Sequence, residues 1–250
     1  MTVWNMLVPG SITRRVIVAR FRVTLLSIKH ELAYQVSYSY PLPPPSTLFG
    51  AFAKALGYSI NCGVRCPEEA RKYVNKIRAG VSSNQKLLKS SAVLVRIRGV
   101  LEDKRLPSDV NELPKFKDAM LREYVFASKS LPVLVVPRSE NSLDVIKATL
   151  PLIDRIGDSE SLVAIEGLEV VEAKPCDSRA VTVVVKSQLA KGGSFIVEKA
   201  TDESGNRDNF AFPVTRKPGM PEEFLEISPI EVNQQVLCAD DLCFPQGGDW

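Results

Sequence analysis

Positively charged side chains concentrate in the middle of the chain, where they could contact phosphate groups. Residues 71–129 contain 14 Lys and Arg against 6 Asp and Glu, whereas residues 200–250 contain 3 against 10. The net charge of the 250 residues is only +3, so the total alone does not indicate a nucleic-acid partner. The distribution predicts a polarised molecule with one phosphate-attracting segment. A solvated surface with uneven charge would give the same pattern.

The cations of this basic segment fall on a predicted strand, a projecting loop and a returning strand. Side chains of one parity share one face of a strand, so they could follow the phosphates of single-stranded RNA. Unpaired bases stack on aromatic rings. Five aromatic side chains lie near this segment in the sequence, and several of them must belong to the core. They are Tyr34, Tyr38, Tyr40, Tyr124 and Phe126. The predicted RNA contacts in this segment are Lys89, Arg96, Arg98, Lys104, Arg105, Lys115, Lys117, Arg122 and Lys129.

Residues suited to catalysis are sparse. His30 is the single histidine, and no partner signature accompanies it, so a packing or surface role is the simpler interpretation. The sequence contains no Walker-type, dinucleotide-binding or Gly-x-Ser-x-Gly motif. Asp154, Asp158 and Glu160 are close in sequence, but a divalent metal site needs several oxygen ligands that converge. We therefore predict a non-catalytic chain without a cofactor or metal.

Five cysteines give an odd count with no regular framework: Cys62, Cys66, Cys176, Cys238 and Cys243. Neither Cys62 and Cys66 nor Cys238 and Cys243 have the two-residue gap of a zinc knuckle. A four-thiolate zinc site built from these two pairs and a disulfide both stay open. The simplest expectation is that neither pair binds a metal.

The first half of the chain predicts a strand followed by two helices. Residues 15–28 alternate apolar side chains with polar ones, and we expect Arg20 and Arg22 on the polar face to contact RNA. Prolines interrupt residues 41–45, after which Ser46 or Thr47 could cap a helix through Leu56 that ends at Gly57. A second helix is predicted over Pro67 to Ala79 because acidic residues open it and basic residues close it.

The rest of the chain alternates strands with one broken helix, which indicates an α+β fold. Strands are predicted near 93–98, 122–137, 162–173, 180–187 and 194–200, with a projecting polar loop at 100–120 and a helix at 142–156 that Pro151 interrupts. We expect one domain over 1–204 that includes a basic hairpin at about 86–137. Residues 205–250 are acidic and weakly periodic, and predict an irregular extension packed on that domain.

A glycine pair separates two of these strands. Lys191-Gly192-Gly193-Ser194 is typical of a hairpin turn. Alternatively, its exposed amides and Lys191 could approach an RNA backbone.

Two segments resemble the signatures of a known family. Tyr40-Pro-Leu-Pro-Pro-Pro-Ser-Thr-Leu-Phe-Gly50, directly after a long strand, resembles the Pro-rich loop and Pro-Ser-x-x-x-Gly helix of the CRISPR-associated RAMP proteins. Leu152-Ile-Asp-Arg-Ile-Gly-Asp-Ser-Glu-Ser161 resembles an Arg-x-Gly segment that follows a helix in the same proteins. The chain is most similar to the fifth Cas family, in particular to archaeal type I-A members.

This resemblance implies a ferredoxin-like (RRM-type) domain with a thumb-like hairpin, to which residues 100–120 would belong. It implies a subunit of the Cascade effector complex that caps the 5′ handle of the crRNA. Its partners would be a backbone RAMP subunit and the large subunit, with target DNA reached only indirectly. The amide groups of the helix start at Ser46 could then receive phosphate, and Gly192 and Gly193 would represent a reduced form of the family's glycine-rich loop.

Two other functions stay open. Type I-C members of this family cleave crRNA precursors without metal, using tyrosine, lysine and histidine, so this chain could be a metal-independent endoribonuclease of CRISPR repeats with His30 as acid or base; its Lys29-His30 pair lies at the end of the first predicted strand. Alternatively, the basic middle could meet an acidic protein partner without RNA contact. The sequence has no run of 18 apolar residues and no secretory signal pattern, so we expect a cytoplasmic protein that does not enter a membrane.

Overall fold

The computed structural model describes residues 14–31, 38–96, 99–217 and 224–250, which fold into a mixture of helices and strands. In the first part of the chain the elements are β1 (Arg14–Val23), α1 (Pro45–Ile60), η1 (Gly63–Arg65), α2 (Cys66–Tyr73), β2 (Val74–Ala79), β3 (Leu87–Arg96), α3 (Gly99–Glu102), η2 (Val110–Glu112), α4 (Leu113–Phe116), β4 (Asp118–Ala127), β5 (Leu131–Pro137), α5 (Ser142–Thr149) and η3 (Leu150–Leu152). They are followed by β6 (Val163–Cys176), β7 (Ala180–Val181), β8 (Val185–Lys186), η4 (Ser187–Leu189), β9 (Ala190–Gly192), β10 (Ile196–Thr201), β11 (Arg207–Phe212), β12 (Val214–Arg216), β13 (Phe224–Ile227), β14 (Ile230–Val232), β15 (Val236–Ala239) and β16 (Leu242–Pro245). The predicted α+β class is confirmed.

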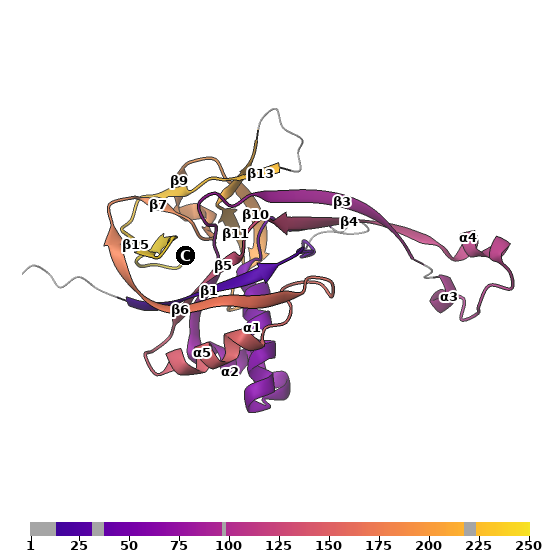
Figure 1. The fold of residues 1–250 in the computed structure, drawn as a ribbon, viewed down its shortest axis with the longest axis horizontal. Helices are drawn as coiled ribbons and strands as arrows, with labels where there is room; N and C mark the ends of the chain where they lie inside the picture. Colours follow the sequence, from indigo (N-terminus) through magenta and orange to yellow (C-terminus); the bar gives the residue numbers. More distant parts are fainter. Residues whose placement is uncertain (1–13, 32–37, 97–98, 218–223) are drawn as a thin grey trace, which may run out of the picture.

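A six-stranded antiparallel sheet in the order β16-β15-β6-β1-β5-β2 organises the molecule. The chain leaves β1, passes through α1 and α2 to β2, and later passes from β5 through α5 to β6. In Figure 1 these three helices lie on one face of the sheet, and most of the short C-terminal strands lie on the other. None of the helices in the described ranges is long and apolar enough to cross a membrane.

The central strand β1 is buried on both faces. Ile17 and Phe21 belong to the core cluster that includes the helices, whereas Val16 and Val18 belong to a second cluster with the C-terminal strands. The predicted alternation therefore describes one face correctly. On the other face arginine occurs only at the two ends of the strand: Arg14 begins it, and the half-buried Arg20 and the exposed Arg22 lie near its end.

Helix α1 differs from the prediction at both ends. Pro44 precedes it and no side chain caps it, so the predicted Ser46 cap is wrong. The helix passes Gly57 and ends at Ile60, and Asn61, the cap residue that follows, has φ 48 and takes the left-handed conformation instead. A Cβ atom at Gly57 would lie 3.0 Å from Sγ of Cys66, so close packing on α2 explains this glycine.

The predicted second helix is only half correct, because α2 ends at Tyr73 and the chain continues as β2. Val74 and Ile77 are buried there, and β2 pairs with β5 at the sheet edge. Pairing with a strand more than 50 residues away in the chain overrides the helical preference of this segment. The broken helix at Pro151 is confirmed as α5 followed by η3, with Leu143 and Ile146 inward.

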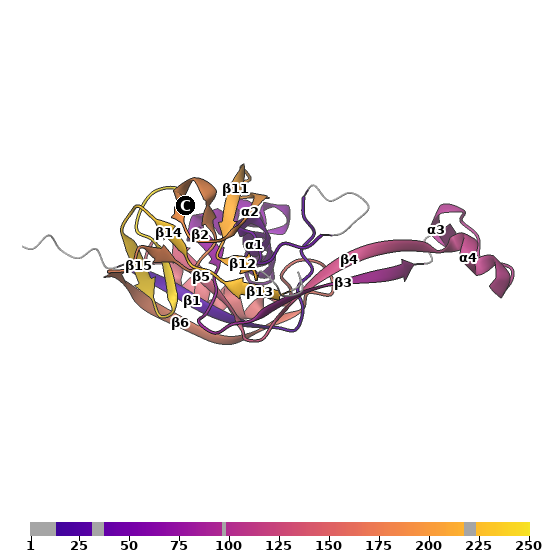
Figure 2. The same ribbon diagram turned by 90° about the horizontal axis from the view of Figure 1, so that it is seen from above.

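Strands β3 and β4 with the helices between them form an arm that projects from the body. The two strands pair from Leu87 and Ala127 to Arg96 and Asp118. Both views show them running outward to a tip that contains α3 and α4 (Figures 1 and 2). The prediction that residues 100–120 project is confirmed, but the tip is helical.

The expectation of an irregular C-terminal extension is wrong, because its described residues form β11 to β16. Strand β15 pairs with both β6 and β16 and thus extends the central sheet. The ring of Trp250 is buried and lies 5.6 Å from that of Phe244. The predicted division of the chain into residues 1–204 and 205–250 stays a prediction. The central sheet contains strands from both parts, since β6 precedes residue 204 and β15 and β16 follow it.

The buried Arg78 cation of β2 binds groups of the C-terminal part of the chain. The Arg78 side chain is 0% exposed and pairs with Glu203, which also accepts a 2.8 Å hydrogen bond from the Ile77 N–H. Arg78 also donates to the carbonyl of Trp250. Nearby, Asp249 lies 2.7 Å from Nζ of Lys76 and also pairs with Lys186.

We expect Glu203→Gln to lower the free energy of unfolding by about 3–5 kcal/mol, because it leaves the buried Arg78 cation without a counter-charge. Denaturant unfolding measures this loss. Glu140→Gln is the matched control, since Glu140 pairs with Arg15 on the exposed surface and should change stability by no more than about 1 kcal/mol. Equal losses of unfolding free energy in the two variants would contradict the conclusion that the buried Arg78–Glu203 pair stabilises the fold.

Asp249 should make stability pH-dependent in acid. Its hydrogen bonds to Lys186 and Lys76 lower its pKa from 3.8 to about 2. The folded-state pKa is below the unfolded one, so its contribution is complete above about pH 4 and disappears as the pH falls through about 2. Its carboxylate is 63% exposed, so we expect Asp249→Asn to cost at most about 1 kcal/mol at neutral pH. Denaturant unfolding at neutral and at acid pH should show that the stability difference between Asp249→Asn and the wild type becomes smaller in acid. Asp144→Asn is the control, because the Asp144 side chain is 96% exposed, and its stability should stay close to that of the wild type at both pH values.

Candidate functional site: a cationic cleft between two sequence motifs

An open cleft of about 450 Å³ lies where the two motifs meet. They are about a hundred residues apart in the chain, yet one motif supplies a face of α1 and the other a loop after η3. The residues lining the cleft come from α1, from the loop after η3 and from the segment that follows β1: Ile28, Lys29, Thr47, Gly50, Ala51, Lys54, Arg155, Gly157 and Asp158.

Hydrogen bonds hold the Arg155–Asp158 loop against the segment that follows β1. The N–H of Asp158 donates to the carbonyl of Ser27, and the N–H of Ser27 donates to Oγ of Ser161. Gly157 has φ +109, and a Cβ atom there would lie 2.7 Å from Cγ1 of Ile28. Only glycine allows this approach without a shift of the backbone or of Ile28, which explains the glycine of the second motif.

The face of α1 that lines the cleft follows helical spacing. Thr47, Gly50, Ala51 and Lys54 are separated by three, one and three residues, so they share one side of the helix. The opposite side buries Phe52 and the other apolar residues of this helix. The hydrophobic pattern of α1 thus determines which residues face the cleft.

Positive charge predominates around the cleft. Lys29 and Lys54 are exposed and Arg155 is half-buried, whereas Asp158 is the one acidic residue in the lining. A 2.8 Å salt bridge joins Nζ of Lys54 to Asp154, and this bond raises the pKa of Lys54 and lowers that of Asp154. Nε of Arg155 is buried and has no hydrogen-bond partner among the described residues. The cleft can therefore accommodate an anion.

Gly50 leaves open space at the cleft. A Cβ atom added to it would meet nothing within 4 Å. A glycine inside a helix costs about 0.5–1 kcal/mol relative to alanine, and no contact within the described chain requires it. An exposed glycine at this position lets an external group approach the helix backbone closely.

The cations predicted on the arm do not form one track. Lys89 lies opposite Val125 and Arg122 opposite Ala92 in the strand register, which places the two cations on opposite faces. Nζ of Lys89 is 2.7 Å from Glu123. Arg122 pairs with Glu160 and lies 3.6 Å from Asp158, so it joins the arm to the cleft loop.

The remaining predicted contacts are scattered over the surface. At the arm tip Lys104, Lys115 and Lys117 are exposed, and Arg105 lies 3.1 Å from Glu112. The side chain of Arg96 and all of Arg98 lie outside the described residues. RNA contact by these residues stays a prediction.

Arg20, Arg22 and Lys129 lie at the base of the arm. Arg20 is held by Asp240 and by Asp241, the latter at 2.9 Å. Arg22 pairs with Glu166, and Nζ of Lys129 donates to the carbonyl of Ser83. These partners already occupy some of the N–H donors of each cation, and an RNA phosphate would have to compete with them.

The predicted phosphate site at Ser46 has few amides to offer. Pro45 has no N–H group, and the N–H groups of Thr47 and Leu48 both donate to the carbonyl of Pro44. Ser46 is half-buried and is not part of the cleft lining.

Gly192 and Gly193 do not form a hairpin turn, because β9 pairs with β14 whereas β10 pairs with β11. A Cβ atom at Gly193, where φ is +93, would lie 2.9 Å from the carbonyl oxygen of Pro229. The close passage of β14 thus explains this glycine. Lys191 beside it is exposed, and its predicted RNA contact stays untested.

The aromatic residues are divided between core and surface. Tyr40 is 2% exposed, donates a 2.7 Å hydrogen bond to the carbonyl of Lys199, and burial raises its pKa to about 12. His30 stacks on it with ring centroids 4.7 Å apart. Tyr38 is 51% and Phe126 36% exposed, so these two can still meet a base, while Tyr34 lies outside the described residues.

Sequence reasoning missed Lys29, Lys54 and Arg155 as site residues. Arg155 stands inside the second motif, and Lys54 follows Gly50 by one helical turn, so the motif and the helical spacing were available signals. Lys29 had been noted only as part of a Lys-His pair. Its position beside the cleft depends on the chain path after β1, which no local pattern reveals.

Comparison with known proteins agrees with the two motifs. A family model described as "CRISPR-associated protein (Cas_Cas5)" matches residues 16–222. A CRISPR-associated protein Cas5 of Thermoproteus tenax is 38% identical over 231 residues, which cover 92% of this chain and 96% of the relative. A CRISPR-associated protein Cas5 of Methanocaldococcus jannaschii is 34% identical over 154 residues, which cover 57% and 60% of the two chains.

Solved structures include a similar fold. The crystal structure of a CRISPR protein from Archaeoglobus fulgidus has a TM-score of 0.52 at 16% identity and covers 92% of this chain and 98% of that one. A chain of a CRISPR RNA-guided surveillance complex has a TM-score of 0.43 at 13% identity, with 87% and 90% covered. The first of these shows a shared fold.

Proposed function

Because the chain belongs to the CRISPR-associated Cas5 family, we propose that it is a non-catalytic subunit of a type I CRISPR effector complex, Cascade. In this role it binds and caps the 5′ handle of the crRNA and helps to assemble the complex for antiviral defence in the cytoplasm. The archaeal type I-A systems are the proposed context. The cationic cleft that joins the two family motifs is the observation that carries the proposal.

The chemistry of the cleft suits the sugar-phosphate backbone. Arg155 lines the cleft, and guanidinium groups suit phosphate oxygens geometrically. Lys29 is exposed at the same cleft and would add charge. The missing side chain at Gly50 allows the RNA backbone to approach α1. These features suit the sugar-phosphate backbone of the RNA and do not read its base sequence.

We further propose that the domain is a ferredoxin-like RAMP domain. The strand order β6-β1-β5-β2, with helical connections from β1 to β2 and from β5 to β6, supports this. The arm corresponds to the thumb. Because it is inserted between β2 and β5, it leaves the order of the four strands unchanged.

The arm is the proposed contact for neighbouring protein subunits as well as for RNA. Large apolar side chains are exposed along it: Val93, Val95, Leu101, Leu106 and Val110. Side chains of this kind lose exposed apolar surface when a protein partner covers them. A backbone RAMP subunit and the large subunit are the proposed partners.

Neutralising Arg155 should weaken binding of the handle RNA. We expect Arg155→Gln to raise the Kd for an oligonucleotide carrying the repeat-derived 5′ handle about tenfold and to reduce the salt dependence by about one ion. Fluorescence anisotropy at several salt concentrations measures both. Gly50→Ala should also weaken binding while stabilising the free chain by about 0.5–1 kcal/mol.

Lys147→Gln is the matched control, because Lys147 is exposed on α5 and does not line the cleft. It should leave Kd within about twofold. If Arg155→Gln binds like Lys147→Gln, the cleft is not the RNA site. If no variant and no wild type retains RNA at moderate salt, the alternative of a protein-interaction subunit without RNA contact is correct.

The proposal predicts no cleavage of CRISPR repeat RNA by this chain. His30 is mostly covered, stacks on Tyr40, and its Nε2 lies 3.2 Å from Glu198 on β10, and His30 is not among the residues that line the cleft. Incubation of labelled repeat RNA with the protein in excess chelator should leave it intact. A specific product that disappears with His30→Ala would establish the endoribonuclease instead.

A further inference from the structure

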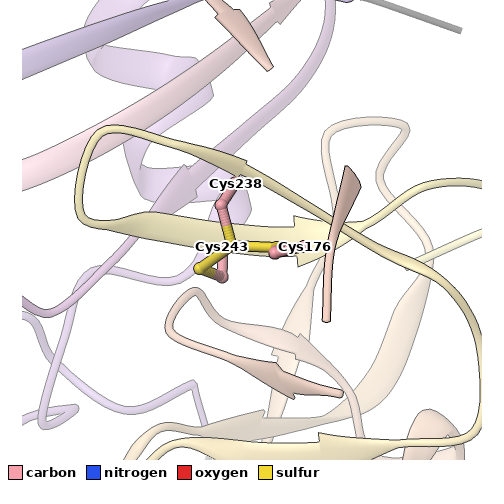
Figure 3. A group of neighbouring side chains, drawn as sticks. All are labelled: Cys176, Cys238 and Cys243. Carbon is pink, nitrogen blue, oxygen red and sulfur yellow. A yellow bond between two sulfur atoms is a disulfide. The ribbon is translucent and has the colours of Figure 1, made fainter. Parts of the chain in front are cut away.

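Three of the five cysteines converge at the edge of the central sheet. The Sγ atoms of Cys176, Cys238 and Cys243 all lie within 4.8 Å of one another, and the three residues are half-buried. Figure 3 shows the side chains pointing toward a common point. Cys62 and Cys66, which form a disulfide between α1 and α2, are not part of this cluster. The four-thiolate arrangement considered from the sequence therefore does not occur.

The sheet register explains the convergence. Cys238 on β15 lies directly opposite Cys243 on β16, with Cα atoms 4.1 Å apart. Cys176 ends β6 and lies opposite Val236, two residues from Cys238 on the same side of β15. Three paired strands thus bring the sulfur atoms to one face.

Two disulfides cannot satisfy this cluster. Sγ of Cys238 lies within bonding distance of both Cys176 and Cys243, and a sulfur atom forms only one disulfide. Any disulfide leaves the third cysteine as a thiol beside it. A single metal ion, in contrast, can bind all three sulfur atoms at once. A Zn–S distance of about 2.3 Å places thiolates about 4 Å apart, so the two sulfur pairs that lie within bonding distance have to separate to that spacing once they are reduced.

The cluster supplies three sulfur ligands, one fewer than the four of a tetrahedral zinc site. The described residues supply no further His, Cys, Asp or Glu donor to the cluster, which leaves a coordination position for water.

We propose that Cys176, Cys238 and Cys243 bind one thiophilic metal ion of the zinc class. Soft thiolate ligands select such ions over magnesium or calcium. The ion clips the β15–β16 hairpin to β6. The tip of that hairpin carries Asp240 and Asp241, which hold Arg20 of β1. The site is separate from the cationic cleft, and its role does not depend on RNA.

Zinc titration of the full chain tests the site. The protein is purified anaerobically with reductant, stripped with a chelator, and titrated with Zn²⁺ against a chromophoric indicator. We expect one zinc per chain, protection of three thiols from a thiol-reactive reagent, and a higher Tm with zinc. Cys243→Ser should weaken binding at least about tenfold, whereas the double variant Cys62→Ser, Cys66→Ser, the matched control, should bind like the wild type.

Cys176→Ser, on a different strand, gives a second measurement if Cys243→Ser does not fold, as far-ultraviolet circular dichroism will show. Co²⁺ bound to the wild type and to the double variant should show thiolate charge-transfer absorption. Wild-type affinity in both single variants overturns the proposal, and so does loss of binding in the double variant. If the fully reduced wild type takes up no zinc, and a small-molecule disulfide instead joins Cys238 to a neighbour, the cluster is a thiol–disulfide pair and the proposal is wrong.

Discussion

Strand β1 is buried on both faces, and this burial determines how the other elements are arranged. Strands β5 and β6 flank it, the helices cover Ile17 and Phe21, and the C-terminal strands cover Val16 and Val18. A strand buried on both sides needs two covering layers, because exposure of either face would return its apolar side chains to water. The C-terminal strands are therefore as much a part of the core as the helices, although they come last in the chain.

The same strand positions the cleft. Its continuation at Ser27 and Ile28 is the surface against which the second motif packs, and Gly157 makes that contact close enough for two hydrogen bonds. Helix α1 packs on the sheet through its apolar side and so presents Gly50 and the neighbouring polar face to the loop. Each motif alone is a turn or a helix start. Together they make a cationic concavity, and this explains why both belong to one signature.

The charged side chains of the arm have a role different from that of the cleft cations. An ion pair holds Lys89 near the base of the arm, and the ion pairs of Arg122, halfway along β4, link the arm to the cleft loop. Such pairs contribute little to stability where they are exposed, but they fix the direction in which a side chain points. The exposed lysines lie at the tip, beyond exposed apolar side chains. The arm therefore combines exposed apolar side chains with exposed positive charge, while the Cys176–Cys238–Cys243 cluster lies on a separate edge of the sheet.

Local sequence patterns were enough to predict the α+β class, the alternating pattern of β1, the buried side of α1, the break at Pro151 and the projection of residues 100–120. Each of these depends on neighbours within a few residues, since hydrophobic period and proline geometry act locally. Both motifs could also be read from the sequence. The folded chain was needed to show that Val74–Ala79 is a strand, that residues after 205 complete the sheet, that Lys89 and Arg122 face opposite ways, and that Cys176 lies beside Cys238. These outcomes depend on which distant segment a strand pairs with and in which register, and a shift of one residue would move every side chain to the other face.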